Sequence, residues 1–231
     1  MIVGRSSDSL EVAGDQLSTQ HQVMVETIVA DLSTDQGMAT VATRLSDDDK
    51  PIDLLVNNAG FGFDGAFLDI DAQDHVRMLR LNCEAVLRLS HAAFGSMVGR
   101  RRGGILNVSS VAGFTSGLRP SPTYSATKAF VTALSEGLAL AAEGSGVQVT
   151  VVCPGFVRTA FHDRAGIDMS KVPAWLWSEA DDVVDAALNG LRTGKSIVIP
   201  GMQYKAVTAF ARHAPRPLLR QAAKMVGRRA R

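Results

Sequence analysis

The feature that most constrains the fold is a regular alternation of short apolar runs with longer amphipathic stretches. Four apolar runs have the length of strands and are rich in Val, Ile and Leu: residues 23–30, 52–57, 104–109 and 147–153. A stretch with helical periodicity follows each of them: residues 34–45, 71–97, 123–143 and 179–191. Strand–helix–strand order implies parallel strands joined by right-handed crossovers, and continuous apolar runs imply a sheet covered on both faces. The sequence therefore predicts an α/β fold with a doubly wound parallel sheet in three α/β/α layers.

Length and composition bound the class of protein. A chain of 231 residues with 46% hydrophobic residues is long enough to fold as one domain, residues 1–231, without disulfides or metal. Cys83 and Cys153 lie inside apolar runs, which favours buried free thiols in a reducing compartment. No apolar stretch approaches the roughly 18–20 residues of a membrane span, and the first residues do not resemble a signal peptide. We therefore expect a cytoplasmic protein.

The charge is unevenly distributed along the chain. The net charge of +1 gives no argument for nucleic-acid binding, but from Asn189 to the C-terminus there are ten Lys and Arg residues and no Asp or Glu. Residues 202–231 are expected to form a basic helical extension, with apolar residues such as Leu218 on one face and basic residues such as Arg220 on another. Such a surface suits an anionic membrane, the acidic remainder of the chain or a second subunit, and the sequence does not choose among them.

Polar and small residues follow several of the predicted strands, at the point where each strand ends. They are Asp31, residues 57–60 (Asn-Asn-Ala-Gly), Ser109 with Ser110, and Pro154 with Gly155. In a doubly wound sheet, ligands bind outside the carboxyl ends of the strands. The sequence therefore predicts a ligand site along this edge of the sheet.

The predicted helix over residues 123–143 carries Tyr124 and Lys128, which are four residues apart and therefore share one face. An isolated phenol has a pKa of about 10, and a nearby ammonium group favours the phenolate. The pair is therefore suited to donate and accept a proton near neutral pH.

The ordered set of Asn-Asn-Ala-Gly, a serine, Tyr-x-x-x-Lys and Pro-Gly on these elements resembles the short-chain dehydrogenase/reductase family, over about residues 1–200. The resemblance implies a Rossmann-like fold and an NAD(P)-dependent oxidoreductase. It makes Tyr124 the acid/base that exchanges a proton with the substrate oxygen, and Lys128 the group that lowers the pKa of Tyr124 and binds the nicotinamide ribose. It makes Ser110 the residue that holds the substrate oxygen, with Ser109 supporting the loop. Asn82 matches the residue that holds a relay water, with a helix-kink asparagine as the alternative.

The same resemblance assigns residues to the cofactor. Asn57, Ala59 and Gly60 match the loop beside the adenine ribose, and the same motif also stabilises the central sheet, so both roles stay open. Asp31 matches the acidic residue beside the adenine ring, with a helix N-terminal carboxylate as the alternative. The loop that the resemblance places over the nicotinamide includes Pro154, Gly155, Val157 and Thr159.

Arg5 bears on the choice of cofactor. It follows the short apolar run over residues 1–4, which is expected to be the tail of a strand that ends beside the adenosine ribose. Enzymes that use NAD place an acidic residue there to bind the 2′-hydroxyl, whereas a guanidinium suits a 2′-phosphate. Arg5 therefore favours NADP over NAD, with a loop-capping arginine as the alternative.

The sequence departs from the family pattern at its start. It contains no Gly-x-x-x-Gly-x-Gly or Gly-x-Gly-x-x-Gly turn there, and such a turn supplies N–H groups to the pyrophosphate. We therefore expect a sheet that lacks its first strand and helix, and weak or absent NADP binding by these 231 residues. Either the natural chain starts further upstream, which the intact catalytic set favours, or the chain is short and impaired in cofactor binding.

Residues 156–178 are expected to form a lid over the substrate. Their many aromatic and aliphatic side chains suit a ketone or 3-oxoacyl substrate, with core packing of short helices as the alternative. The C-terminal third is similar to that of long-chain 3-oxoacyl reductases, and the resemblance implies a homo-oligomer through the helices near residues 70–100 and 123–143. A non-catalytic binding protein with the same fold is the main alternative. A hydrolase or a metal site is not indicated, because the sequence has no Gly-x-Ser-x-Gly elbow and no metal-ligand spacing among its histidines.

Overall fold

The computed structural model describes every residue except 64, 116–121, 162–164, 167–168, 171 and 215–231. Its main sheet has four parallel strands in the order β3-β4-β5-β8. These strands are β3 (Leu54–Asn57), β4 (Gly103–Val108), β5 (Val147–Val152) and β8 (Ile197–Val198). The register pairs Asn57 with Asn107 and Val108 with Val152, so the carboxyl ends of β3, β4 and β5 lie along one edge.

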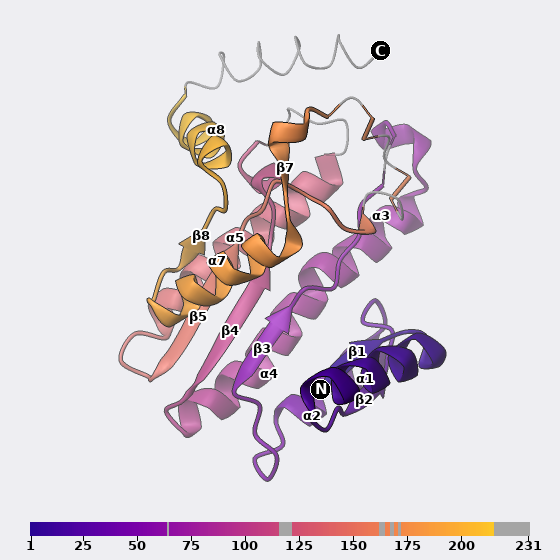
Figure 1. Cartoon of the computed structure of the whole chain (residues 1–231), viewed down its shortest axis with the longest axis vertical. Coiled ribbons are helices and arrows are strands. Elements are labelled where there is room, and N and C mark those ends of the chain that lie inside the picture. The colour runs from indigo at the N-terminus through magenta and orange to yellow at the C-terminus, as the bar shows by residue number, and fades with distance from the viewer. Residues whose placement is uncertain (64, 116–121, 162–164, 167–168, 171, 215–231) are drawn as a thin grey trace.

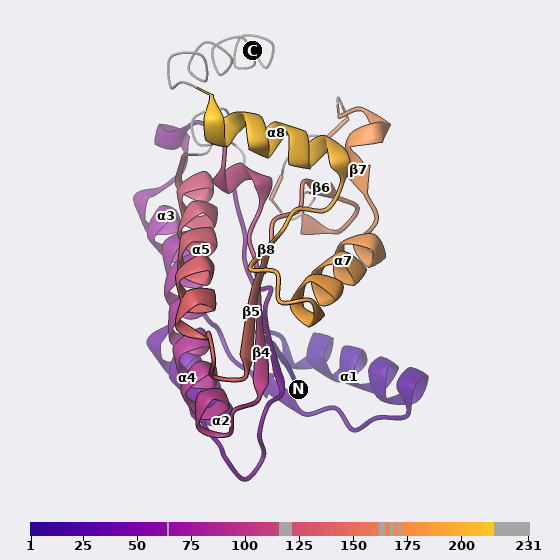
Figure 2. The ribbon, with the colours of Figure 1, turned by 90° about the vertical axis from the view of Figure 1, so that its left-hand side faces the viewer.

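Helices cover both faces of this sheet, as Figure 2 shows. One face carries α2 (Asp35–Leu45), α4 (Val86–Gly99) and α5 (Pro122–Ala141), and the other carries α7 (Ala180–Arg192). Because side chains alternate along a strand, Ile105 packs with Val41 and Met97 on the first face, whereas Leu106 packs with Ala187 on the second. The predicted three-layer α/β/α architecture is confirmed.

The first part of the chain forms a small two-stranded unit, whose Val3 and Ile28 pack against the same core as Ile105. Strand β1 (Ile2–Gly4) pairs in parallel with β2 (Thr27–Val29), and α1 (Ser7–His21) connects them. In the part of the chain that the structure describes, neither strand pairs with the main sheet, and Figure 1 shows the unit beside β3. On β3, Leu54 and Val56 are 37% and 46% exposed. Among the described residues β3 thus pairs only with β4, and the expected absence of a first strand and helix stays a prediction.

Several local predictions need correction or addition. In the predicted strand over residues 23–30 only Thr27–Val29 pairs, and Met24 is fully exposed, because an apolar run forms a strand only where it finds a partner and a core. The helix predicted over residues 71–97 is divided into α3 (Ala72–Leu79), a π-helical turn (Arg80–Ala85) and α4, so its hydrogen-bond pattern changes at Arg80. A second small sheet, β6 (Phe156–Val157) with β7 (Trp177–Ser178), is not evident from the sequence.

The described part of the chain ends with α8 (Met202–His213), which lies within the predicted C-terminal extension. The predicted basic helix further along falls outside the described residues. Short 3-10 turns lie at Phe67–Asp69, Val111–Gly113 and Ala174–Leu176. None of the helices placed by the structure is both long and apolar enough to cross a bilayer.

Candidate active site

Tyr124 and Lys128 lie one turn apart near the start of α5. The Nζ atom of Lys128 is 5.7 Å from the centre of the Tyr124 ring, and it donates a 2.9 Å hydrogen bond to the carbonyl of Val108 at the end of β4. Lys128 is 5% exposed, whereas Tyr124 is half-buried. The structure therefore places a buried ammonium group next to a phenol that solvent can reach, as the predicted acid/base pair requires.

Burial determines the ionisation of Lys128. Removal of the ammonium group from water lowers the pKa of Lys128 to about 8. The thiols of Cys83 and Cys153 interact with it, but burial raises the pKa of each thiol to about 11, so both are neutral at pH 7. Lys128 is therefore mostly protonated at pH 7, and its charge is available to stabilise a phenolate on Tyr124.

Asn82 holds the loop that follows β3. Its Oδ1 accepts a hydrogen bond from the Phe61 N–H (3.1 Å), and its Nδ2 donates to the Phe61 carbonyl (2.9 Å) and to Oγ1 of Thr127 (3.1 Å). The residue lies in the π-helical turn, an irregularity that is frequent at functional sites. Because protein groups bind both ends of the Asn82 amide, its role in holding a relay water stays a prediction.

Two glycines let the same loop approach the catalytic residues. A methyl group on Gly60 would lie 3.1 Å from Oδ1 of Asn82 and 3.5 Å from Nζ of Lys128. A methyl group on Gly62 would lie 3.0 Å from the ring of Tyr124. Both positions therefore favour glycine because of close packing. Gly60 is part of the predicted site, whereas Gly62 is an addition whose only sequence signal is its place two residues after the Asn-Asn-Ala-Gly motif.

The two serines after β4 have different surroundings. Ser109 is 3% exposed, and its hydroxyl donates to the backbone carbonyl of Lys128 (2.7 Å), which fixes α5 to β4. Ser110 is partly exposed; its hydroxyl accepts from the Ala112 N–H (3.1 Å) and donates to the Pro154 carbonyl (3.4 Å). This difference favours Ser110 over Ser109 as the residue that holds a substrate oxygen.

The loop after β5 lies beside these serines. The carbonyl of Pro154 also accepts a backbone N–H from the 3-10 turn that follows β4 (3.0 Å). Val157 packs against the core under α7, and the exposed Thr159 accepts from the Phe161 N–H (3.3 Å). The ring of Phe161 lies 6.0 Å from that of Tyr124. The described part of the predicted lid thus reaches the predicted acid/base.

Asn57 points into the protein. Its Nδ2 donates to Oγ of Ser90 (3.0 Å) and to Oδ1 of Asn107 (2.8 Å), and Asn107 in turn donates to Oγ of Ser135 (2.9 Å). Of the two roles left open for Asn57, these contacts of its Nδ2 support stabilisation of the sheet. Ala59 lies exposed at the edge of the sheet.

Arg5 and Asp31 lie together, away from Tyr124, at the ends of β1 and β2, where Gly4 pairs with Val29. Burial opposes the ionisation of Asp31, but hydrogen bonds from the N–H (2.9 Å) and the hydroxyl (2.7 Å) of Ser33 outweigh it and, with the charge of Arg5, lower the pKa of Asp31. The side chain of Arg5 is exposed. An ionised carboxylate and an accessible guanidinium therefore stand at the position predicted for the adenosine half of the cofactor.

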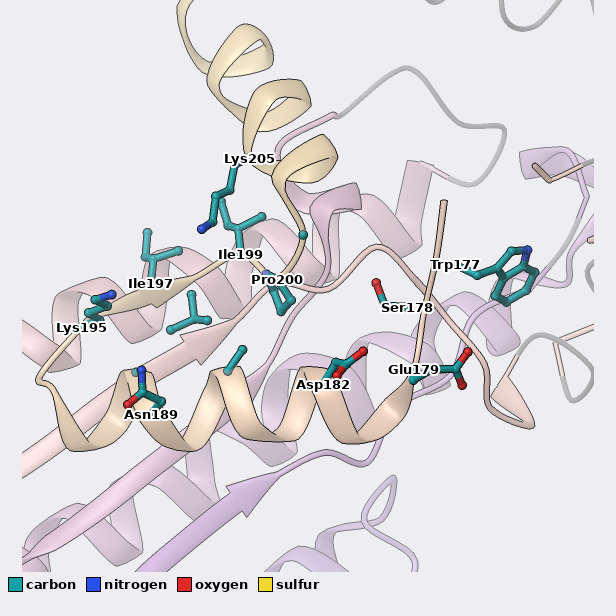
Figure 3. Close-up of a pocket in the computed structure, with 14 residues that line it drawn as sticks. Trp177, Ser178, Glu179, Asp182, Asn189, Lys195, Ile197, Ile199, Pro200 and Lys205 are labelled. Carbon is teal, nitrogen blue, oxygen red and sulfur yellow. The ribbon is translucent and has the colours of Figure 1, made fainter. Parts of the chain in front are cut away.

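A pocket of about 480 Å³ lies elsewhere, between α7, β8 and the start of α8 (Figure 3). Glu179 and Asp182 line it from α7, and Lys195 and Lys205 line it from the opposite side. These charged side chains are exposed, and the pocket contains none of the predicted site residues. The pocket therefore does not coincide with the site predicted at Tyr124, which stays the candidate active site because the predicted acid/base pair lies there.

The residues present fit the nicotinamide half of NAD(P). The fixed ammonium group of Lys128 is a donor for a ribose hydroxyl, and the glycine at position 60 leaves the adjacent space free of a side chain. Near its start, where the family resemblance places the pyrophosphate, the sequence has no glycine-rich turn. Among the residues with described positions, no group of three or more His, Cys, Asp or Glu side chains is placed to hold a metal ion.

Comparison with protein families and curated relatives gives consistent results. The family model described as short chain dehydrogenase matches residues 1–169. The 3-oxoacyl-acyl-carrier-protein reductase FabG of Haemophilus influenzae is 32% identical over 190 residues, which cover 77% of this chain and 77% of the relative. Galactitol 2-dehydrogenase of Rhizobium johnstonii is 34% identical over 155 residues, which cover 66% of this chain and 60% of the relative.

Solved structures agree with this comparison. A short-chain dehydrogenase from Sphingobium yanoikuyae in complex with NADPH has a TM-score of 0.81 and 34% sequence identity, covering 91% of this chain and 82% of its own. A bulky-bulky ketone specific alcohol dehydrogenase from Comamonas testosteroni has a TM-score of 0.76 and 32% sequence identity, and the match covers 93% of this chain and 84% of that dehydrogenase. Both likenesses cover more than nine tenths of this chain.

Proposed function

The chain belongs to the short-chain dehydrogenase family of NAD(P)-dependent oxidoreductases, and we propose that it uses NADPH to reduce a hydrophobic ketone or 3-oxoacyl compound to an alcohol. The observation that carries the proposal is the assembly of Tyr124, Lys128 and Ser110 at the carboxyl ends of β4 and β5. A half-buried phenol, a buried ammonium group and a partly exposed hydroxyl are the groups that carbonyl reduction needs.

In the proposed reaction each residue has one task. A bound nicotinamide cofactor supplies the hydride. Tyr124 donates its phenolic proton to the substrate oxygen as negative charge develops there, and the Ser110 hydroxyl donates a hydrogen bond to the same oxygen. Lys128, held by the Val108 carbonyl, stabilises the phenolate that remains on Tyr124.

The substrate class is proposed from the lid and from the relatives. Phe161 lies close to Tyr124, and Phe156 and Trp177 are 5.9 Å apart at the base of the lid, so apolar surface borders the reacting groups. The name of the relative from Haemophilus influenzae specifies a 3-oxoacyl thioester, and that of the structure from Comamonas testosteroni specifies bulky ketones. A carbonyl with an apolar substituent is common to both.

NADPH is proposed over NADH because Arg5 is exposed at the end of β1. A guanidinium there attracts a 2′-phosphate, whereas no carboxylate stands at that strand end to accept from a 2′-hydroxyl. The neighbouring structure from Sphingobium yanoikuyae contains NADPH, which supports this choice.

The proposed assembly is a homo-oligomer in the cytoplasm. Apolar side chains are exposed on the helices expected at the interface, namely Val76, Leu79, Leu87, Phe130 and Leu140. The contact of the C-terminal extension with an anionic membrane also stays a proposal. Its support within α8 is the exposure of Met202 and Phe210, and its basic remainder falls outside the described residues.

Two measurements test the function. One follows NADPH oxidation with a panel of straight-chain and branched ketones and a 3-oxoacyl thioester. The other is a fluorescence titration of NADPH binding. Turnover that increases with the apolar length of the substrate supports the proposed function. The alternative is a binding protein that keeps the fold without catalysis. It is favoured by the lack of a glycine-rich turn near the start of the sequence and by the separation of β1 and β2 from the main sheet among the described residues. Absence of NADPH binding and turnover, both in this chain and in one extended upstream, supports that alternative.

A further inference from the structure

Tyr204, near the start of α8, lies outside every motif that carries the family resemblance. Its side chain is buried, and its hydroxyl accepts a hydrogen bond from the Phe156 N–H (3.0 Å) and donates one to the carbonyl of Leu176. Phe156 and Leu176 are twenty residues apart in sequence and lie near the two ends of the predicted lid. One hydroxyl group therefore ties the two ends of the lid together.

The ring of Tyr204 makes a second contact, with Gly155. A methyl group on Gly155 would lie 1.9 Å from Cζ of Tyr204, so the ring lies directly on the glycine backbone. Gly155 is not among the residues with positive φ, so the close approach of the ring, rather than the backbone conformation, requires glycine at this position. The glycine of the Pro-Gly motif is thus packed against a helix that begins 47 residues later.

These contacts lead directly to the candidate active site. Phe156 begins β6, which pairs with β7 through Phe156 and Trp177, and Leu176 precedes β7. The residue before Gly155 is Pro154, whose carbonyl binds the hydroxyl of Ser110. Figure 2 shows α8 lying across the end of the molecule that carries β6 and β7.

We propose that Tyr204 is a positioning residue that fixes the Pro154–Gly155 loop and both ends of the lid relative to Ser110. The proposal deepens the proposed function, on which it rests for the roles of the lid and the loop. It adds a task for α8, which holds the substrate side of the site from the C-terminal part of the chain.

Tyr204→Phe tests the proposal in the full chain because it keeps the ring over Gly155 and removes only the hydroxyl. Phe156 N–H and the Leu176 carbonyl then lose a buried partner. We expect hydrogen exchange at the Phe156 amide, followed by NMR, to become about tenfold faster, the factor that the loss of one hydrogen bond allows. We expect the KM for the ketone to rise about tenfold, while kcat changes less than about threefold.

Thr208→Val is the matched control. Thr208 is buried one turn further along α8, and among the described residues its hydroxyl binds only carbonyls of the helix itself, at Tyr204 (2.8 Å) and Lys205 (3.1 Å). Thermal unfolding of both variants measures the general cost of losing a hydroxyl from α8. The proposal would be overturned if Tyr204→Phe and Thr208→Val had the same hydrogen-exchange rate at the Phe156 amide and the same KM for the ketone.

Two further substitutions test the contact of the Tyr204 ring with Gly155 independently of the hydrogen bonds of the hydroxyl. In Gly155→Ala the new methyl group would clash with the Tyr204 ring, so we expect this variant to be less stable than wild type. In a Tyr204→Ala background the ring is absent and the same change causes no clash. The double variant is therefore expected to unfold at a higher temperature than additivity of the single changes gives. Strict additivity would contradict the packing argument.

The exchange and unfolding measurements need no turnover. A wild-type chain that reduces no ketone but shows faster Phe156 exchange after Tyr204→Phe would refute the proposed function and leave the role of Tyr204 in the loop intact. An active enzyme in which Tyr204→Phe changes neither exchange nor KM would refute the role of Tyr204 alone.

Discussion

The two regions expected to contact the cofactor are built in different ways. Around Lys128, buried hydrogen bonds hold α5 to the end of β4 and to Asn82, which in turn binds the loop after β3. Arg5 and Asp31 lie on a two-stranded unit that shares no strand pairing with the main sheet in the described residues. The comparison teaches that the residues proposed to react are held by the core of the fold, whereas those proposed to bind the adenosine lie at the rim of a small unit.

We expect the largest loss of turnover from a substitution in the first region, at Tyr124. Tyr124→Phe removes the proton donor and leaves the ring, so we expect a loss of turnover on the order of 10²–10⁴-fold. Thermal unfolding should change little, because Tyr124 is only half-buried. Initial rates and unfolding temperatures measured on the same preparation check both expectations; turnover that survives the change would remove Tyr124 from the proposed mechanism.

Lys128→Met is expected to lower activity by about 10²-fold and to stabilise the protein at neutral pH. The folded-state pKa of Lys128, about 8, lies below the ordinary value of 10.5, so the protonated form is disfavoured on folding. This penalty is fully present below pH 8 and disappears as the pH rises above 10.5. At pH 7 it amounts to as much as about 3 kcal/mol, and at pH 10 to less than about 1 kcal/mol.

Denaturant unfolding of wild type and Lys128→Met at pH 7 and pH 10 measures this difference. Titrations of groups that do not interact with Lys128 are common to both proteins and cancel in the comparison. The thiols of Cys83 and Cys153 do interact with Lys128, but they are neutral at pH 7 and make no contribution there. Lys128→Met also loses the hydrogen bond to the Val108 carbonyl. This loss lowers the stability of the variant by an amount that does not depend on pH. A stability difference that is the same at both pH values would show that Lys128 is not desolvated as the structure indicates.

At the rim, Arg5→Ala is expected to have a smaller and more selective effect. Loss of one exposed guanidinium should lower the ratio of kcat/KM with NADPH to that with NADH by about tenfold, with kcat unchanged. The effect should shrink in high salt, because the interaction is exposed. Arg102→Ala is the matched control, since Arg102 is an exposed arginine at the opposite end of the strands and pairs with Asp53. Equal changes in both variants would argue against a 2′-phosphate site at Arg5.

The same contrast explains how much the sequence reveals. The α/β architecture and the bounds of α2 follow from apolar periodicity and helix-capping residues, whereas the grouping of Asn82 with Tyr124 and Lys128 follows from the family resemblance. The inward direction of the Asn57 side chain cannot be predicted from local sequence, because it depends on contacts with Ser90 and Asn107 in other elements. These contacts join residues that are 33 and 50 positions apart and leave no local pattern.

The contacts around Tyr204 are hidden for the same reason. The hydroxyl of Tyr204 meets Phe156 and Leu176 only after α8 has folded across β6 and β7, two strands of two residues each that have no detectable periodicity. Gly155 belongs to a recognisable Pro-Gly motif, but the ring that requires the glycine cannot be identified from the motif. Local patterns therefore locate the chemistry, and tertiary packing determines how that chemistry is held.

The smallest expected effect compares two helix caps, one in each region. Ser6 caps α1 through the Ser9 N–H (3.2 Å), and Thr34 caps α2 through the Gly37 N–H (3.0 Å). Either change to Ala should cost about 1 kcal/mol. Helix α2 contributes Val41 to the main core, so Thr34→Ala should lower the global stability, whereas Ser6→Ala should mainly speed hydrogen exchange in α1 and leave turnover at saturating NADPH unchanged. Equal losses of global stability would mean that the small unit unfolds together with the main sheet, and the two regions would then differ in composition but not in cooperativity.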